Sequence, residues 1–187
     1  MGKSEEAEKN FIDADELCIK IKGTQLHSIW GGFYVDFLIS ANRINEAFEL
    51  TKQNLEISIN ISKNPNDISR CHRCLASIER MKGNYEEAEF HIQEGLNIAR
   101  KINMTELEIE ALIENGRLRL DLKRPEDAIG DAENVLKICV RTGFRFYEPG
   151  AEVGSNMRKF ATCAGVFSFE SLVLSLFEIA ASLRSSQ

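Results

Sequence analysis

The sequence has little proline, three residues in 187, and no stretch rich in serine, glycine and proline divides it into parts of different composition. With 43% hydrophobic and 28% charged residues it is too apolar for a disordered chain, so we predict one continuous domain over residues 1–187. An excess of basic residues is also missing, because the formal net charge is -6. A nucleic-acid groove needs a dominant basic surface, and we therefore predict no nucleic-acid partner.

Long apolar runs are missing as well. The amino-terminal residues are polar and contain no apolar segment of the length that a signal peptide needs. The most apolar stretch, near the carboxyl end, is interrupted by Glu170 and Glu178 and is too short to cross the hydrocarbon layer. We therefore predict a cytoplasmic protein without a membrane partner. An odd number of cysteines predicts reduced thiols and fits this compartment; they are Cys18, Cys71, Cys74, Cys139 and Cys163.

What the sequence does contain is a repeat. Alanines recur 40, 41 and 40 residues apart, each after a turn-forming residue and an acidic pair or its remnant, at Ala7, Ala47, Ala88 and Ala128. A period of this length indicates stacked helical hairpins, since one hairpin cannot bury its apolar face alone. We therefore predict an all-α fold, a solenoid of antiparallel helix hairpins with about nine helices.

Turn residues place the helices. Asn66 or Asp67 is predicted to cap a helix that ends near Lys82, and Asn84 with Glu87 resembles a capping box for the next helix, over 85–101. Corresponding signals predict helices over about 24–41, 45–62, 105–122, 125–141, 148–164 and 168–184. The predicted organisation is a half unit over 1–23, units over 24–64, 65–103 and 104–143, and a degenerate terminal unit over 144–187.

The unit over 65–103 resembles a tetratricopeptide repeat. The matching residues are Leu75, Ala76, Gly83, Tyr85, Ala88 and Leu96, at motif positions 7, 8, 15, 17, 20 and 28. The next unit keeps Gly116, Ala128 and Leu136 but has Pro125 where the motif has tyrosine. The resemblance is to the longer variety of the family, with repeats of about 40 residues, and covers residues 2–142 well. It implies a right-handed superhelix with a concave groove that binds a peptide or protein segment.

In that family, four positions of each first helix line the groove. Several arginines fall at these positions here, and an arginine stripe on an acidic protein predicts an acidic ligand, held by bidentate hydrogen bonds. The alternative is that the arginines pair with Glu106, Glu110 or Glu114 of the neighbouring helix. The lysine and asparagine pattern of the family's carboxylate clamp is absent. The predicted groove residues are Gly32, Asp36, Arg70, Arg73, Ser77, Arg80, Ile113 and Arg117.

The helix over 24–41 combines aromatic residues with an unusual pair of glycines. Trp30, Phe33, Tyr34 and Phe37 recur at helical spacing, and we predict that they lie in the core. Gly31 and Gly32 each weaken a helix interior, so each needs a compensating role. That role is either tight packing of helices or, at Gly32, close approach of a ligand backbone.

Cys71 and Cys74, with His72 between them, could share one helix face toward a metal ion. However, they fall at core positions of the repeat, where free cysteine acts as a small hydrophobic residue. No second Cys/His pair follows at zinc-finger spacing. We predict neither a metal nor a cofactor, and keep a metal or redox role of the two cysteines as a minor alternative. The three histidines, His27, His72 and His91, show no partner in the sequence that would indicate catalysis.

The sequence therefore predicts a non-enzymatic scaffold for protein–protein interaction. The alternative is a structural or oligomerisation segment of a larger signalling or transcription-regulating protein. A homo-oligomer would form through the terminal helices, since the last one is unusually apolar for an end of such a stack. The predicted interface residues are Leu172, Leu176, Phe177 and Leu183.

Overall fold

The computed structural model describes residues 3–142, with side chains from Glu5 onward. Over these residues the chain is helical and has no strand, as the sequence predicts. The elements are α1 (Lys3–Lys22), α2 (Ser28–Ser40), α3 (Ile44–Ile57), the π-helical turn η1 (Ser58–Ser62), α4 (Pro65–Lys82), α5 (Tyr85–Lys101), α6 (Thr105–Asp121) and α7 (Pro125–Thr142). None of the helices in this part of the chain is long and apolar enough to span a membrane.

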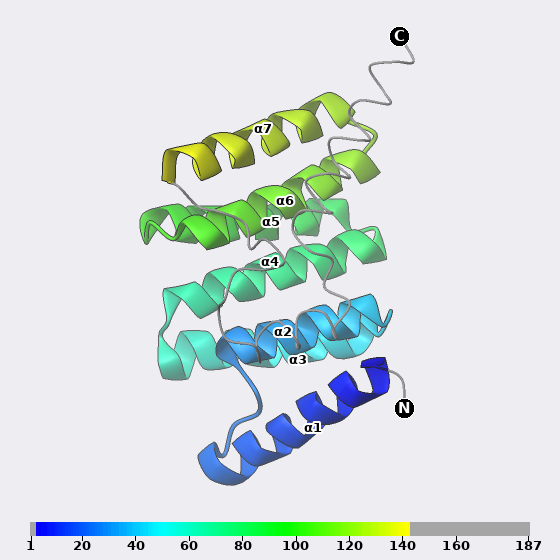
Figure 1. Cartoon of the computed structure of the whole chain (residues 1–187), viewed down its shortest axis with the longest axis vertical. Helices are drawn as coiled ribbons and strands as arrows, with labels where there is room; N and C mark the ends of the chain where they lie inside the picture. Colours follow the sequence, from blue (N-terminus) through cyan, green and yellow to red (C-terminus); the bar gives the residue numbers. More distant parts are fainter. Residues whose placement is uncertain (1–2, 143–187) are drawn as a thin grey trace.

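In Figure 1 the stack runs from α1 at the bottom to α7 at the top, and in this view α2 overlaps α3 and α5 overlaps α6. From α2 onward each helix packs against the next, and α4 also contacts both α2 and α6. These three helices therefore share one face, which we call the α2–α4–α6 face. The helices predicted over 148–164 and 168–184 lie outside the described residues, as do Leu172, Leu176, Phe177 and Leu183.

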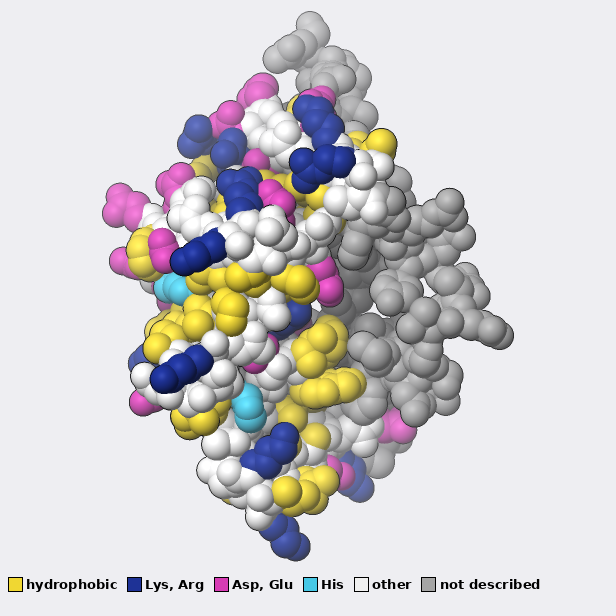
Figure 2. Space-filling view, turned by 90° about the vertical axis from the view of Figure 1, so that its left-hand side faces the viewer, with side chains coloured by type: hydrophobic (Ala, Val, Ile, Leu, Met, Phe, Trp, Pro, Cys, Tyr) yellow, Lys and Arg dark blue, Asp and Glu magenta, His cyan; other side chains and the backbone are white. Residues whose placement is uncertain are grey.

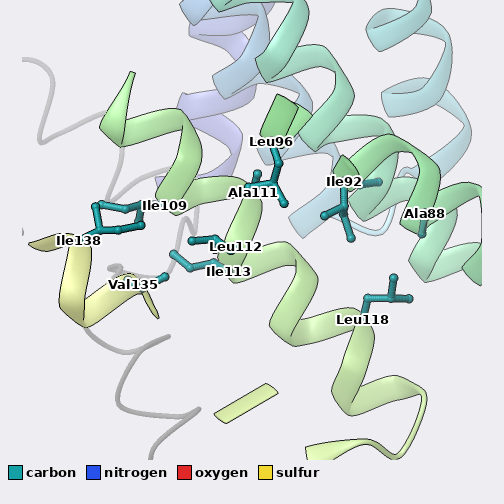
Figure 3. Close-up of a cluster of buried hydrophobic side chains, with 11 residues drawn as sticks. Ala88, Ile92, Leu96, Ile109, Ala111, Leu112, Ile113, Leu118, Val135 and Ile138 are labelled. Carbon is teal, nitrogen blue, oxygen red and sulfur yellow. The ribbon is translucent and has the colours of Figure 1, made fainter. Parts of the chain in front are cut away.

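The repeated alanines lie where helices pack. Ala7, Ala47, Ala88 and Ala128 are between 0% and 2% exposed, because a small side chain lets two helices approach closely. Ala88 belongs to a cluster of buried apolar residues that joins α4 to α7, with Ile92, Leu96 and Ile109 among its members (Figure 3). A second cluster joins α1 to α4 and includes Phe11, whose ring stacks on Tyr34 with 4.9 Å between centroids. The period of the alanines therefore reflects the spacing of close contacts between helices.

The longer interval between Ala47 and Ala88 coincides with the π-helical turn. A π-helical turn holds more residues than an α-helical one, so it accommodates an extra residue without breaking the helix. At η1 the buried Ser58 hydroxyl donates to the Asn54 carbonyl at 2.7 Å, and Lys63 in the left-handed region then ends the segment. The extra residue of the 41-residue interval is therefore absorbed inside the second helix of its hairpin.

The helix ends agree with the predictions better than the caps do. The cap of α4 is Asn64, whose side chain accepts from the Asn66 backbone N–H at 3.1 Å, so the assignment to Asn66 or Asp67 was wrong. The capping box at α5 does not form, because the Asn84 side chain donates to Glu79 of the preceding helix at 2.6 Å. Both errors arise because a polar side chain near a turn has several competing partners.

The first unit begins later than predicted. We expected a helix from Gly23 and Thr24, but α2 begins at Ser28. Gly23 has a φ of 69° and ends α1, and the Leu26 backbone N–H then donates to the Asp15 carboxylate of α1 at 2.5 Å. This contact holds the connection in a non-helical conformation, and it depends on α1 lying alongside.

Candidate functional site

Charged side chains cross the α2–α4–α6 face in what we call the charged row. It consists of Asp36 on α2, Arg70, Arg73 and Arg80 on α4, and Glu110, Glu114, Arg117 and Asp121 on α6. Helix α4 lies in the middle and supplies only cations to the row. The two outer helices supply every anion. Each arginine of α4 can therefore bridge to a neighbouring helix.

The first half of the row joins all three helices. Arg73 donates both terminal nitrogens to the Asp36 carboxylate of α2, with Nη2 2.9 Å from Oδ2. On its other side, Arg73 Nε lies 3.7 Å from Glu110 Oε2 of α6. Arg70 Nη1 reaches the same carboxylate at 3.3 Å. The Nε atoms of Arg70 and Arg73 are buried without a hydrogen-bond partner, so Glu110 is held less closely than Asp36.

The second half of the row centres on Glu114, whose side chain is 2% exposed. Arg80 Nε lies 2.7 Å from one of its oxygens, and Arg117 Nη1 lies 2.9 Å from the other. Arg80 also reaches Asp121 with Nη1, at 2.7 Å. Both oxygens of a buried carboxylate are therefore matched by guanidinium donors, which is the arrangement that offsets the cost of burying a charge.

The pKa shifts of the two glutamates follow from this difference in distance. Burial raises the pKa of Glu110, and Arg73 and Arg70 are too far away to reverse it. Burial has the same tendency at Glu114, but the close contacts with Arg80 and Arg117 outweigh it and lower the pKa of that carboxyl. The charged form of Glu114 is thus stabilised by the row, whereas that of Glu110 is not.

The charged row is balanced, with four arginines and four carboxylates. The alternative stated above is the arrangement observed: the arginines of α4 pair with Glu110 and Glu114, although not with Glu106, and Asp36 is a further partner. Charges of both signs are also interspersed on the side of the molecule seen in Figure 2. Such a balanced row does not favour an acidic ligand over one that carries both signs.

The predicted groove residues fall into two groups. Asp36, Arg70, Arg73, Arg80 and Arg117 are half-buried members of the charged row. The other three predicted residues, Gly32, Ser77 and Ile113, are buried.

The two glycines of α2 are explained by packing. A Cβ atom at Gly32 would lie 2.7 Å from Arg70 Cδ, so the missing side chain makes room for the stem of that arginine. A Cβ atom at Gly31 would lie 2.6 Å from Asn54 Nδ2 and 2.7 Å from the Leu26 carbonyl oxygen. The packing interpretation therefore accounts for both positions.

The aromatic residues of α2 are only partly core. Phe37 is buried and Phe33 and Tyr34 are half-buried, whereas Trp30 is 42% exposed, so its placement in the core was wrong. The indole and the Phe33 ring meet edge to face, with 5.9 Å between centroids. Trp30 comes early in the helix, where the periodicity assigned it to the same stripe as residues one and two turns later. The indole is therefore partly exposed at the surface.

The cysteine pair of α4 lies in the interior. Cys74 is 1% exposed and belongs to the cluster that joins α1 to α4, and Cys71 is also buried. Burial raises the pKa of Cys71 to about 12 and raises that of Cys74 as well, so both remain protonated thiols at neutral pH. Thiols are poorer nucleophiles and metal ligands than thiolates. These surroundings favour the core interpretation of the pair.

Two histidines form a contact that sequence analysis missed. His72 on α4 and His91 on α5 place their Nδ1 atoms 3.0 Å apart, and both rings are half-buried. Burial lowers the pKa of His72 to about 4, assisted by His91, and lowers the pKa of His91 too. The antiparallel register of α4 and α5 about the Gly83 turn brings the two positions opposite each other. The positions of the two histidines relative to the Gly83 turn were therefore the signal from which this contact could have been predicted.

Comparison with known proteins adds no relative, because no protein-family model, curated protein sequence or solved structure matches the chain.

Proposed function

We propose that this protein is a non-enzymatic interaction scaffold, a right-handed solenoid of the tetratricopeptide type that binds a peptide or protein segment on its α2–α4–α6 face. The observation that supports this proposal is the charged row, in which ion pairs tie three helices that are not consecutive in the chain. Side chains held in this way lose little further freedom when a ligand binds, which favours affinity.

The charged row also indicates the chemistry of the ligand. Arg117 and Asp121, with side chains 35% and 39% exposed, offer a cation and an anion at the same end of the row. A segment carrying both an acidic and a basic residue can pair with them while the more buried pairs stay intact. We therefore propose a ligand of mixed charge, in place of the acidic segment expected from the arginines alone.

Arg117→Ala is the variant that tests this proposal. Variants of Arg73 and Arg80 are less suitable, because these side chains hold the three helices together and their loss would disturb the fold. Peptides are first selected from a random display library for binding to the full wild-type chain. They should bind Arg117→Ala at least tenfold more weakly than wild type, a loss of about 1.4 kcal/mol in binding free energy. Fluorescence anisotropy with labelled peptides measures the change, and circular dichroism checks the fold.

Arg100→Ala is the matched control. Arg100 on α5 is exposed, pairs with Glu108 at 2.9 Å and does not belong to the charged row, so its variant should bind as wild type does. If the selected peptides bind Arg117→Ala and wild type equally, the α2–α4–α6 face is not the binding surface and the proposal fails.

A second candidate function, assembly with another copy of the chain, is favoured by α1. Leu17 and Ile21 lie one turn apart on this helix and are 56% and 70% exposed. Exposed apolar patches of this kind mark interaction surfaces. Here α1 contributes Phe11 to the core while these two side chains lie at the surface.

Light scattering coupled to size exclusion tests the assembly candidate. The wild-type chain should elute as a dimer, and Leu17→Ser combined with Ile21→Ser should shift it to a monomer. Val140→Ser is a control, because Val140 on α7 is 85% exposed but far from α1 in the stack. A wild-type chain that remains monomeric at every concentration would refute assembly through α1.

A further inference from the structure

Helices α4 and α5 approach closely where the histidine pair lies. A Cβ atom at Gly95 would be 3.5 Å from the Ser69 carbonyl oxygen and 3.6 Å from His72 Cβ, so this glycine of α5 lies directly against α4. The Ser69 hydroxyl donates to the Gly95 carbonyl at 2.9 Å and fixes the approach. His91 precedes Gly95 by one helical turn and therefore shares its face of α5. The two imidazoles are thus brought together by packing on a rigid hairpin.

We propose that His72 and His91 form a binding site for a divalent transition-metal ion, of the Ni²⁺ or Cu²⁺ type, between α4 and α5. The two Nδ1 atoms lie 3.0 Å apart, with 5.2 Å between ring centroids and 47° between ring planes. Imidazole nitrogen is a preferred ligand for these ions. This site is independent of the charged row and goes beyond the scaffold function proposed above.

The distance between the nitrogens fits two ligands of one metal ion. With metal–nitrogen bonds of about 2.05 Å, two ligands at a right angle lie about 2.9 Å apart, and two tetrahedral ligands lie about 3.3 Å apart. The observed 3.0 Å is close to the right-angle value. Square-planar and tetragonal sites of nitrogen and oxygen ligands are typical of Cu²⁺ and Ni²⁺. The two nitrogens are therefore close enough to bind one ion.

The local charge supports the same site. Three carboxylates act on His91, and their negative charge favours a dication; they are Glu79, Glu87 and Glu94. In the pair, one Nδ1–H donates to the other Nδ1. Metal binding moves that proton to Nε2 of the same ring, so the protein releases no net proton.

The site offers two protein ligands and leaves the other positions to water. Within residues 3–142, no group of three or more His, Cys, Asp and Glu side chains could hold a metal ion. Each imidazole must turn so that its Nδ1 lone pair points to a shared ion and no longer to the other ring. The torsion involved, χ2 of histidine, is a soft one. We therefore expect binding weaker than that of a structural metal centre with four protein ligands.

Calorimetric titration of the untagged full chain with Ni²⁺ tests the proposal. Ni²⁺ is the suitable probe because Cu²⁺ would oxidise the half-buried thiols of Cys18 and Cys139. Wild type should bind one Ni²⁺. His72→Ala and His91→Ala should each reduce the affinity for Ni²⁺ at least tenfold. Addition of Ni²⁺ should also raise the melting temperature of wild type and leave that of either variant unchanged.

His27→Ala serves as the control, because His27 precedes α2 and its Nδ1 lies 3.0 Å from the Gln25 carbonyl oxygen, so it belongs to neither α4 nor α5. It should bind Ni²⁺ as wild type does. If a histidine variant fails to fold, His91→Gln preserves a polar side chain and removes the ligand nitrogen. Wild-type affinity for Ni²⁺ in a folded His72 or His91 variant overturns the proposal, and so does the absence of Ni²⁺ binding by wild type.

Discussion

Replacing Glu114 with alanine is expected to lower the free energy of unfolding by about 3 kcal/mol, the lower end of the range for removing one partner of a buried ion pair. The Glu114 side chain is 2% exposed and accepts from two guanidinium groups. Its loss leaves Arg80 and Arg117 facing each other across the vacated position. Arg80 keeps Asp121, and the Arg117 side chain is 35% exposed, so the effect should not reach the top of the range.

Urea denaturation at pH 7, followed by circular dichroism, measures this effect. Arg124→Ala is the control, because its pair with Asp127 joins side chains that are 57% and 40% exposed, and such a pair contributes about 0 to 1 kcal/mol. Equal losses from Glu114→Ala and Arg124→Ala would show that the charged row does not stabilise the stack of helices.

The effect of Glu114→Ala should also depend on pH. The pKa of Glu114 is lowered in the folded protein from an ordinary value of 4.5, so the unfolded chain binds its proton first as the pH falls. The stability that Glu114 contributes is therefore complete above about pH 4.5 and is lost as the pH falls through the lowered folded value. Wild type and Glu114→Ala should approach the same stability in strong acid.

Replacing Gly31 with alanine is expected to destabilise the protein by about 2 kcal/mol. Overpacking costs about 1 to 3 kcal/mol or more, and the better helix propensity of alanine offsets about 1 kcal/mol of it. The new methyl group would lie 2.7 Å from the Leu26 carbonyl oxygen, which is backbone and cannot rotate away. Asp15 also holds the Leu26 N–H, so relief requires a shift of α1 or α2.

Gly130→Ala is the control that separates the effect of helix propensity from the cost of the steric contact. Gly130 lies in α7, and a Cβ atom there meets nothing within 4 Å. The substitution should therefore stabilise the protein by about 1 kcal/mol through helix propensity alone. Thermal unfolding of both variants measures the difference. A neutral or stabilising Gly31→Ala would show that α1 and α2 are not held as closely as the structure indicates.

Helix positions were largely predictable because their signals are local. Gly83 lies in the left-handed region at the end of α4, and Pro125 begins α7, as their backbone preferences require. The caps were less predictable, because Asn84 had a choice between its own helix and Glu79. The late start of α2 depended on Asp15 of α1, a contact between separate helices that no local pattern contains.

The candidate site was predictable in its residues but not in their roles. The repeat period placed the arginines of α4 one unit away from the carboxylates of α6, and the pairing of Arg80 with Glu114 was therefore among the alternatives. An arginine is long enough to reach either a neighbouring helix or a ligand. Only the distances between helices show that the carboxylates of the chain itself occupy these guanidinium groups.

By itself, the sequence determined that this protein is helical and that the spaced alanines mark close contacts between helices, because turn chemistry and apolar periodicity act over a few residues. The tertiary structure decided what the polar residues do. It paired Arg73 with Asp36, placed Gly32 beneath Arg70 and brought His72 against His91. Each of these contacts depends on how closely two helices approach, and that distance is set by the packing of the whole stack.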